Sequence, residues 1–354
     1  MTVPVSTGAA KIGLIGYGLA GSAFHAPIIS TTAGLELAAI VTGSPERADE
    51  IGQRYPTTTV VPDVATLWEL TLDAVVIATP NSSHVQLASD CIEHGVGTVV
   101  DKPLALTSAQ AADLIVAADA AQVLLTTYQN RRWDGDFLTA TELVESGTLG
   151  AVALFESRFE KWRPEVSDAW KDQTPAEEGG GILLDLGSHL IDQAVLLFGV
   201  VTGVYAEVDA VRPSAIAEDN AFLALTHAGG TRSHLTMSAT AADLGPRLRL
   251  LGTEGAYVSW GLDPQEAALR RGDLPGAGWG VLPADDWGTL SGTTTPGPLP
   301  THPGDYPAFY RALAAALRDG GPPPVDPSDA VTTLRIIEAA RESSASRTFV
   351  NLTA

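Results

Sequence analysis

The chain has 354 residues, with 45% hydrophobic and 18% charged side chains and a formal net charge of −21. These values are typical of a soluble globular protein of about two domains, and the acidic balance argues against a nucleic-acid partner. The single cysteine, Cys91, excludes an intrachain disulfide and a cysteine-based zinc site. We expect a cytoplasmic location without a membrane span, because no apolar run approaches about 18 residues and residues 1–10 lack the basic flank of a signal peptide.

The first third of the chain alternates short apolar runs with helical periodicity. Strands are predicted at Lys11–Ile15, Leu37–Thr42, Ala74–Ala78, Thr98–Val100 and Val123–Thr126. Helices are predicted between them at Ala20–Ser30, Ser44–Tyr55, His84–His94 and Ser108–Ala120. Buried strands that alternate with helices indicate a parallel sheet covered on both faces. We therefore predict an α/β domain over residues 1–127.

From residue 128 onward the pattern changes to a helix followed by longer strands. The helix is predicted at Asp136–Gly147, and the strands at Ala151–Phe159, Gly203–Val211, Ala221–Thr226, Thr231–Ser238 and Leu248–Trp260. Tight turns between consecutive strands predict an antiparallel sheet, so residues 128–354 are expected to form an α+β domain. Asp263–Asp305 is expected to be a long surface excursion, and helices at Tyr306–Asp319 and Asp329–Ser344 complete the chain.

A glycine-rich turn connects the first strand to the first helix. It comprises Gly16, Tyr17, Gly18, Leu19, Ala20 and Gly21. In a strand–turn–helix setting, such glycines permit a tight turn, close approach of a pyrophosphate and close helix packing, while the helix N-terminus attracts phosphate. The alternative is a glycine-rich turn without a ligand. We predict that these six residues bind a dinucleotide in a Rossmann domain.

The residues after the second strand bear on the choice of dinucleotide. No carboxylate follows Val41 at the position that would bind a ribose 2′-hydroxyl. Thr42 and Ser44 can donate hydrogen bonds to a 2′-phosphate there, and Arg47 can neutralise it. NADP is therefore the expected cofactor, although Glu46 could turn toward the ribose and leave NAD possible.

Two further loops follow strands at the same edge of the predicted sheet. They contribute Thr79, Pro80, Asn81 and His84 after the third strand, and Asp101 and Lys102 after the fourth. Ligands of such folds bind beyond the carboxyl ends of the strands, so these residues are predicted to bind the cofactor. The alternative is that Asn81 or Ser82 caps the next helix, and one residue can fill both roles. His84 is expected to pack beside the cofactor without catalysing the reaction.

The catalytic candidates are Lys102, Asp185 and His189. Lys102 is one of only four lysines, although a surface lysine remains the alternative. Asp185 and His189 stand four residues apart, share a helix face, and so place a carboxylate where it can orient a general base. Gly187, between them in sequence, suggests close approach of a ligand or backbone. A core histidine is the alternative for His189, and the three glycines at 179–181 argue against it. Asp192 lies about 10.5 Å from Asp185 along the helix axis, so no metal site is expected.

With these residues in place, the chain resembles the Gfo/Idh/MocA oxidoreductase family, and within it the NADP-dependent scyllo-inositol dehydrogenase branch. The family carries the Rossmann motif, a Glu-Lys-Pro signature and the glycine–aspartate–histidine helix. In this chain Asp101 replaces the usual glutamate of the signature. The branch tends to place an arginine where this chain has Ser44. The closer match is carried by Gly16–Pro27, Tyr128–Phe137, Arg163–Glu165 with Trp170, and Leu184–Gln193.

The resemblance implies a Rossmann domain, then an open-faced and mainly antiparallel sheet through which a homodimer or homotetramer forms. It implies that His189, oriented by Asp185, takes the proton of a substrate hydroxyl that Lys102 polarises. Further candidates for the substrate walls are Tyr128, Arg131, Trp162 and Arg163, with interdomain packing as the alternative. We expect a small neutral cyclic polyol or sugar as substrate, with scyllo-inositol leading. A non-catalytic dinucleotide-binding sensor and a redox-assisted glycosidase of the same fold are the alternative functions.

Overall fold

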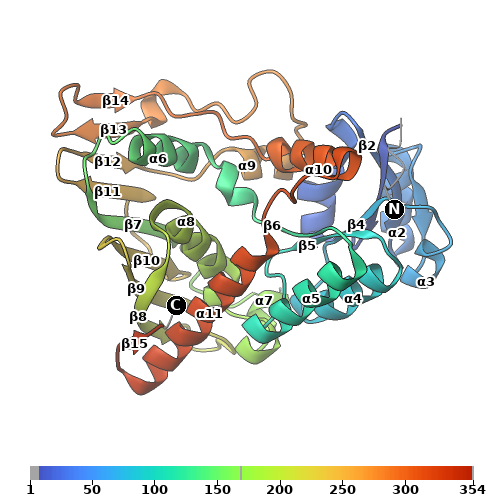
Figure 1. The fold of residues 1–354 in the computed structure, drawn as a ribbon, viewed down its shortest axis with the longest axis horizontal. Helices are drawn as coiled ribbons and strands as arrows, with labels where there is room; N and C mark the ends of the chain where they lie inside the picture. The colour runs from blue at the N-terminus through green and yellow to red at the C-terminus, as the bar shows by residue number, and fades with distance from the viewer. Residues whose placement is uncertain (1–7, 168–169, 353–354) are drawn as a thin grey trace.

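The computed structural model describes residues 8–167 and 170–352, and two β-sheets organise them (Figure 1). The first sheet has six strands in the order β3-β2-β1-β4-β5-β6, all paired in parallel. Its strands are β1 (Ala10–Ile15), β2 (Leu35–Val41), β3 (Thr59–Val61), β4 (Ala74–Ile77), β5 (Gly97–Asp101) and β6 (Leu125–Tyr128). The predicted parallel sheet is confirmed. β3 escaped prediction because three residues carry too little periodicity.

Helices cover both faces of this sheet. They are the π-helix η1 (Ala20–His25), α1 (Ala26–Thr31), α2 (Pro45–Arg54), α3 (Val64–Leu67), η2 (Asn81–Ser83), α4 (His84–Glu93) and α5 (Ser108–Ala121). Two separate apolar clusters lie on the two faces of the strands. Side-chain caps start three of the helices, with Ser44 accepting from the amide of Arg47, Asp63 from that of Thr66 and Thr107 from that of Gln110. The predicted helix at Ala20–Ser30 differs in that its first part is π-helical.

The second sheet has nine strands in the order β14-β13-β12-β11-β7-β10-β9-β8-β15. They are β7 (Val152–Glu160), β8 (Val201–Asp209), β9 (Asn220–His227), β10 (Arg232–Ser238), β11 (Leu248–Gly252), β12 (Ala256–Ser259), β13 (Gly288–Ser291), β14 (Gly297–Leu299) and β15 (Val350–Asn351). Every pairing is antiparallel except that of β7 with β10. The expected fold class, a Rossmann domain followed by a mainly antiparallel sheet, is confirmed.

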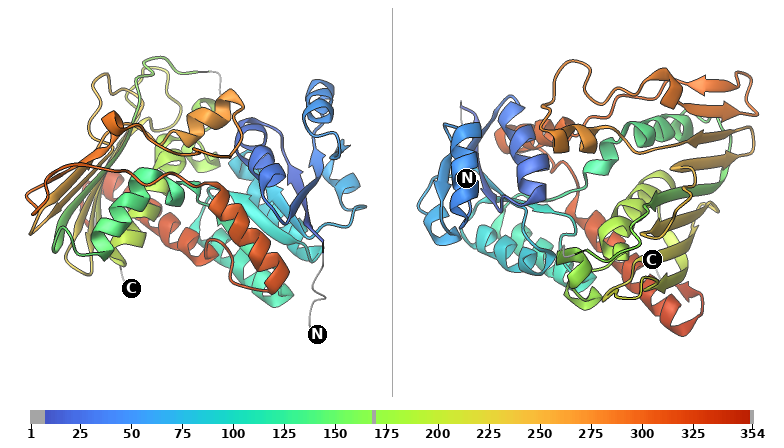
Figure 2. Two further views of the ribbon diagram at one scale, coloured as in Figure 1. Left: turned by 90° about the horizontal axis from the view of Figure 1, so that it is seen from above. Right: turned by 180° about the vertical axis from the view of Figure 1, so that it is seen from behind.

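Helices lie against one face of this second sheet, and the other face is open in the part of the chain that the structure describes (Figure 2). The remaining helical elements are η3 (Asn130–Trp133), α6 (Gly135–Glu145), α7 (Trp170–Gln173), η4 (Ala176–Glu178), η5 (Leu183–Gly187), α8 (Ser188–Phe198), α9 (Gln265–Arg271), η6 (Ala284–Asp286), α10 (Pro307–Asp319) and α11 (Pro327–Ser346). Along β7 the burial alternates, with Phe155 and Phe159 fully buried on the helix side. Glu156 on the open side pairs with Arg158 and Arg249.

Two sequence predictions in this half were wrong. The predicted strand Leu248–Trp260 is a hairpin, because the turn at 252–255 reverses the chain, with the Gly252 amide donating to the Gly255 carbonyl. The segment Asp263–Asp305 is not a plain excursion, since it carries α9 and the edge strands β13 and β14. Those two strands have four and three residues, too short to show alternation in the sequence.

The last two helices connect the two sheets. α10 packs Tyr306, Phe309 and Tyr310 against the first sheet, in the same apolar cluster as Leu14 of β1. α11 lies between α5 of the first half and β8 of the second (Figure 1). The two sheets are therefore joined by the last helices of the chain as well as by residues 128–135, where the chain passes from the first half to the second. Within the described residues, no helix has both the length and the apolar character that a bilayer span requires.

Candidate active site

The glycine-rich turn has the shape of a phosphate cradle. Gly16 has a φ of 97°, and a Cβ there would lie 2.5 Å from the Ala78 carbonyl oxygen. A Cβ on Gly21 would lie 2.0 Å from the Gly16 carbonyl oxygen, whereas a Cβ on Gly18 would meet no atom within 4 Å. Packing therefore requires glycine at two of these positions. Gly18 faces open space, which fits the approach of a pyrophosphate to the helix N-terminus.

The other residues of this turn differ in how they are placed. The Tyr17 ring is buried, and its hydroxyl lies 3.4 Å from Oε1 of Glu50 on α2. Burial raises the pKa of Tyr17 to about 12. The Leu19 side chain is exposed, and Ala20 begins η1. Tyr17 thus anchors the turn, and the turn presents main-chain amides to the position of a phosphate.

The loop after β2 offers groups of both charges. The Ser44 hydroxyl donates to Oε2 of Glu46 at 2.7 Å and accepts from the Arg47 amide at 3.3 Å, while the Thr42 hydroxyl accepts from the Ser44 amide at 3.3 Å. The Ser44 hydrogen bond lowers the pKa of Glu46. No ion pair engages the Arg47 guanidinium among the residues described. The loop therefore presents a carboxylate suited to a ribose hydroxyl beside a cation suited to a phosphate.

The loop after β4 is tied to the second half of the chain. Nδ2 of Asn81 donates to the Gly179 carbonyl at 2.8 Å, so this side chain links the two halves and does not cap α4. The Thr79 and Ser83 hydroxyls lie 2.7 Å apart, with Pro80 between them in sequence. The buried His84 ring places Nδ1 at 2.8 Å from the Pro103 carbonyl and Nε2 at 3.0 Å from the Thr79 carbonyl. His84 thus joins the two loops expected to bind the cofactor.

An ion pair crosses the junction at the end of β5. Nζ of Lys102 lies 2.6 Å from Oδ1 of Asp185 and 2.5 Å from its main-chain oxygen. Lys102 is 12% exposed and Asp185 29%, so both side chains remain open to a small molecule. Burial opposes ionisation of the adjacent Asp101, but the facing His25 ring and Lys102 outweigh it, and the pKa of Asp101 lies below its ordinary value. The structure thus brings together Lys102 and Asp185, two of the three catalytic candidates.

His189 lies in the first turn of α8, immediately after the π-helix η5 that holds Asp185. The ring is 5% exposed and its Nδ1 is 3.1 Å from Oε1 of Gln129. Sequence reasoning assigned the orienting role to Asp185 and missed Gln129. The available signal was its place directly after β6, at the same sheet edge as Lys102 and inside the segment that carries the family resemblance.

The glycines around the segment that carries Asp185 and His189 have a structural explanation. A Cβ on Gly179 would lie 2.9 Å from Asn81 Cβ, one on Gly180 1.8 Å from the Thr174 carbonyl oxygen, and one on Gly181 2.4 Å from the Glu218 carboxyl. A Cβ on Gly187 would meet Leu183 at 2.9 Å and Met237 at 3.3 Å. The close approach that these glycines permit is therefore to protein groups.

The candidate wall residues divide into core and surface positions. Tyr128 is buried against His25, Phe309 and Tyr310, and Arg131 is buried between Asp134, Glu266, Tyr306 and the Phe159 ring. Both lie behind the site, so the packing alternative accounts for them. Trp162 is 57% exposed and Arg163 is exposed. The side chain of Trp170 lies outside those described.

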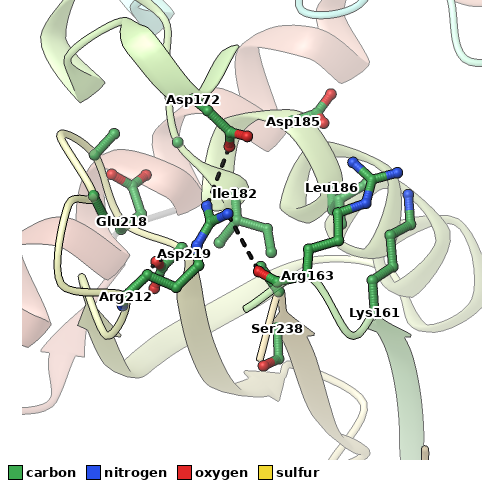
Figure 3. A pocket seen from close by; sticks show the side chains of 14 residues that line it. Lys161, Arg163, Asp172, Ile182, Asp185, Leu186, Arg212, Glu218, Asp219 and Ser238 are labelled. Atoms are coloured by element: carbon green, nitrogen blue, oxygen red, sulfur yellow. Dashed lines mark hydrogen bonds and ion pairs between the residues drawn. The ribbon is translucent and has the colours of Figure 1, made fainter. Parts of the chain in front are cut away.

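A pocket opens beside Asp185, at the C-terminal end of β7 (Figure 3). Arg212 is held by Asp219 at 2.8 Å, by Asp172 at 3.1 Å and by the carbonyls of Arg163 and Glu165. Lys161 and Arg163 extend side by side on the Asp185 side of the pocket (Figure 3). The pocket is also lined by Gly181, Ile182, Leu186, Ala215, Ala217, Glu218, Ser238 and Ala239.

Lys161 is a pocket residue that the sequence prediction did not include. Burial lowers the pKa of its ammonium. Within residues 8–167 and 170–352 this ammonium has no hydrogen-bond or ion-pair partner of its own. Its signal in the sequence was its rarity as a lysine and its place two residues before Arg163. A desolvated cation facing a pocket is suited to bind an oxygen of a ligand.

Asp192, the residue weighed as a metal ligand, is engaged by an arginine. The Arg132 guanidinium binds both of its oxygens, at 2.8 and 2.6 Å, and also reaches Asp329 on α11 at 2.8 Å. In the described part of the chain, no three histidine, cysteine, aspartate or glutamate side chains converge as metal ligands. Asp192 therefore connects the catalytic helix to η3 and α11.

Comparison with known proteins identifies both halves. The model of the Gfo/Idh/MocA oxidoreductase family for the NAD-binding Rossmann fold matches residues 10–129, and that for the C-terminal alpha/beta domain matches residues 141–352. The chain is 39% identical over 348 residues to YdgJ of Escherichia coli, an uncharacterized oxidoreductase, with 95% of this chain and 97% of that protein covered.

Two further relatives match along nearly the whole chain. IolW of Bacillus subtilis, an NADP-dependent scyllo-inositol 2-dehydrogenase, is 34% identical over 342 residues, with 94% of this chain and 93% of that protein covered. Among solved structures, the oxidoreductase yvaA of Bacillus subtilis superimposes with a TM-score of 0.93 at 32% identity, with 98% of this chain and 99% of that chain covered.

Proposed function

This chain belongs to the Gfo/Idh/MocA family of NAD(P)-dependent oxidoreductases, and we propose that it is an NADP-preferring dehydrogenase of a cyclic polyol or sugar. The observation that carries the proposal is the pairing of Lys102 with Asp185 across the junction, beside the His189 of the adjoining helix turn. A lysine and a histidine at the carboxyl edge of a dinucleotide-binding sheet suit acid–base work on a hydroxyl. A sensor that only binds a dinucleotide has no need of this arrangement.

The residues at the glycine-rich turn fit a nicotinamide dinucleotide, because the open space at Gly18 leaves room for its pyrophosphate. Thr42, Ser44 and Arg47 would hold the adenosine end, with Glu46 competing for the Ser44 hydroxyl. When bound, the nicotinamide supplies the acceptor or donor of the hydride. We base the NADP preference on Ser44 and Arg47 and on the likeness to IolW.

The chain's own residues handle the proton and the substrate oxygen. Lys102, whose ammonium donates to the main-chain oxygen and to the carboxylate of Asp185, can polarise the reacting oxygen and stabilise negative charge there. Nε2 of His189 is the group proposed to accept the hydroxyl proton during oxidation and return it during reduction. Buried surroundings from Phe159 and Gln129 limit the access of water to the ring.

The pocket beside Asp185 suits a ring that carries several hydroxyls. Lys161 and Arg163 supply donors, Asp172 and Glu218 supply acceptors, and Ile182 and Leu186 supply apolar surface for ring C–H groups. Donors and acceptors in one pocket are what a polyol requires, because each hydroxyl both donates and accepts. scyllo-Inositol is the leading candidate on the likeness to IolW, and its ketone would be reduced in the reverse direction.

The decisive experiment measures kcat/KM for scyllo-inositol, myo-inositol, glucose and glucose 6-phosphate, each with NADP and with NAD, by the absorbance of the reduced nicotinamide. We expect the best values for an inositol with NADP. A clear preference for the phosphate ester would overturn the substrate class, and a preference for NAD would overturn the cofactor assignment.

Replacement of the two catalytic candidates tests their roles. Lys102→Met and His189→Ala should each lower kcat by about 10²–10⁴-fold while the dissociation constant of the dinucleotide changes little, because both side chains lie away from the glycine-rich turn. A His189→Ala enzyme that keeps more than about a tenth of the wild-type rate would contradict a general-base role.

The open face of the nine-stranded sheet is proposed as the contact through which a homodimer or homotetramer forms. Partly exposed Leu154 and Phe222 lie on that face among the Glu156, Arg158 and Arg249 ion pairs. Light scattering coupled to size-exclusion chromatography gives the state in solution. A monomer at micromolar concentration would refute the assembly.

A further inference from the structure

Gln129 is a buried polar residue whose side chain contacts the His189 ring. It follows β6 directly and its side chain is 4% exposed. Its amide nitrogen donates to the Thr127 carbonyl at 2.9 Å, and its carbonyl accepts from the Arg132 amide at 3.2 Å. The main chain on both sides of Gln129 is therefore fixed, and its side chain reaches His189 from an immobile point.

The contact with His189 determines which ring nitrogen carries the proton. The side-chain oxygen Oε1 of Gln129 lies 3.1 Å from Nδ1 of His189, and an amide oxygen can only accept a hydrogen bond. Nδ1 must then carry the hydrogen, and in a neutral imidazole Nε2 is left with its lone pair. That is the tautomer that can take a proton from a substrate hydroxyl.

We propose that Gln129 is the positioning residue of the general base, holding His189 in the Nδ1–H tautomer without giving the ring a counter-charge. The role of His189 as base is taken from the proposed function. The orienting role of Asp185 stays a prediction from the sequence, and the contact that the structure gives its carboxylate is a 2.6 Å ion pair with Lys102. The site thus divides the work, with Asp185 fixing the lysine and Gln129 fixing the histidine.

The use of an amide in place of a carboxylate has a chemical consequence. An opposite charge within about 4–6 Å stabilises a charged partner and moves its pKa by roughly 1–3 units. A carboxylate at position 129 would therefore favour the imidazolium, which cannot act as a base. Charged side chains on the helical segment of His189 are Asp185 and Asp192, and η3, which packs against α8, carries Arg131 and Arg132.

The first test reads the tautomer directly, without turnover. Nitrogen-15 NMR of the full chain with labelled histidine distinguishes a protonated from an unprotonated ring nitrogen, and the signal is assigned by its loss in His189→Asn. We expect Nδ1 protonated and Nε2 unprotonated in the wild type, and loss of this single tautomer in Gln129→Leu. An Nε2–H tautomer in the wild type, or an unchanged tautomer in Gln129→Leu, would overturn the proposal.

A matched control removes another buried glutamine from the same region. Gln193 donates to the Arg131 carbonyl at 2.8 Å and accepts from Arg247 at 3.1 Å, so its loss also breaks two buried hydrogen bonds. Gln193→Leu should lower the melting temperature yet leave the tautomer of His189 unchanged. If Gln193→Leu changed the tautomer as Gln129→Leu does, the effect would belong to general packing and the proposal would be wrong.

The second test uses the pH dependence of kcat/KM. Gln129→Glu keeps the size and the acceptor, so it serves even where Gln129→Leu fails to fold. It should raise the apparent pKa of the base by roughly 1–3 units and recover much of its rate at alkaline pH. An unchanged profile would overturn the proposal. Absence of turnover in the wild type would instead count against the proposed function, because the NMR result does not depend on turnover.

Discussion

Gly18 and Gly21, three residues apart in the glycine-rich turn, should respond in opposite ways to the same added methyl group. A Cβ on Gly21 would lie 2.0 Å from the Gly16 carbonyl oxygen, far inside the ordinary contact distance of 3.4–4 Å. A Cβ on Gly18 would meet no protein atom within 4 Å, and Gly18 does not adopt a positive φ. Gly21→Ala therefore tests packing, and Gly18→Ala tests the space kept for a ligand.

The contact distances set the expected magnitudes. Overpacking of this kind costs about 1–3 kcal/mol, so Gly21→Ala should lower the melting temperature by roughly 2–8 °C. Gly18→Ala should leave stability unchanged or raise it by about 0.4–1 kcal/mol, because alanine restricts the unfolded chain. The substitution should instead weaken dinucleotide binding, raising the dissociation constant at least about tenfold, which corresponds to about 1.4 kcal/mol.

Thermal denaturation without cofactor and a fluorescence titration with NADPH measure the two quantities separately. Gly18→Ala should be stable but a poor binder, and Gly21→Ala should be unstable. A Gly18→Ala protein that binds NADPH as tightly as the wild type would refute the assignment of this space to the pyrophosphate. An unchanged melting temperature for Gly21→Ala would refute the packing argument.

Three further predictions follow from single residues. Ser44→Asp should shift the ratio of kcat/KM values toward NAD, and Glu46→Gln toward NADP, because one adds and the other removes negative charge beside a 2′-phosphate; unchanged ratios would contradict this. Burial raises the pKa of Cys91 to about 12, so a thiol reagent at pH 8 should react at least about tenfold more slowly with the native than with the unfolded protein. Burial raises the pKa of Asp134 from 3.8 to about 7; its contribution to stability is therefore fully present below pH 3.8 and is lost as the pH rises through 7. The melting temperature of Asp134→Asn relative to wild type should accordingly increase between pH 5 and pH 8, and a constant difference would show that Asp134 does not titrate in this range.

Much of the fold could be predicted because its longest elements carry strong local patterns. The strands β1, β2, β4 and β5 are largely apolar runs between helices. The sequence therefore predicted that strands alternate with helices and that these strands pair in parallel. The elements that were missed are short or reversed by a turn, as in β13, β14 and the hairpin after Leu251. Periodicity needs several residues to show, and a glycine-rich turn can interrupt a strand that otherwise looks continuous.

The candidate site was predictable where one residue carries its own chemical signal. Lys102, Asp185 and His189 are rare or regularly spaced, and the structure brings Lys102 and Asp185 into contact. Gln129 could not be found in this way, because its importance comes from His189, a partner 60 residues away. Lys161 is as rare as Lys102, but only the structure shows that it lines the pocket. Only the folded chain shows which polar groups meet across the junction.

The return of α10 to the first sheet has a consequence for anyone who wishes to dissect the molecule. A fragment that ends at residue 128 would lose Tyr306, Phe309 and Tyr310, and the apolar surface around Leu14 that they cover would be open to water. A self-standing nucleotide-binding module would therefore need residues 306–319 grafted on by a linker. A chimaera that joins this nucleotide-binding half to the second half of another protein must likewise keep α10 of this chain. The segments before and after residue 128 are therefore not independent modules.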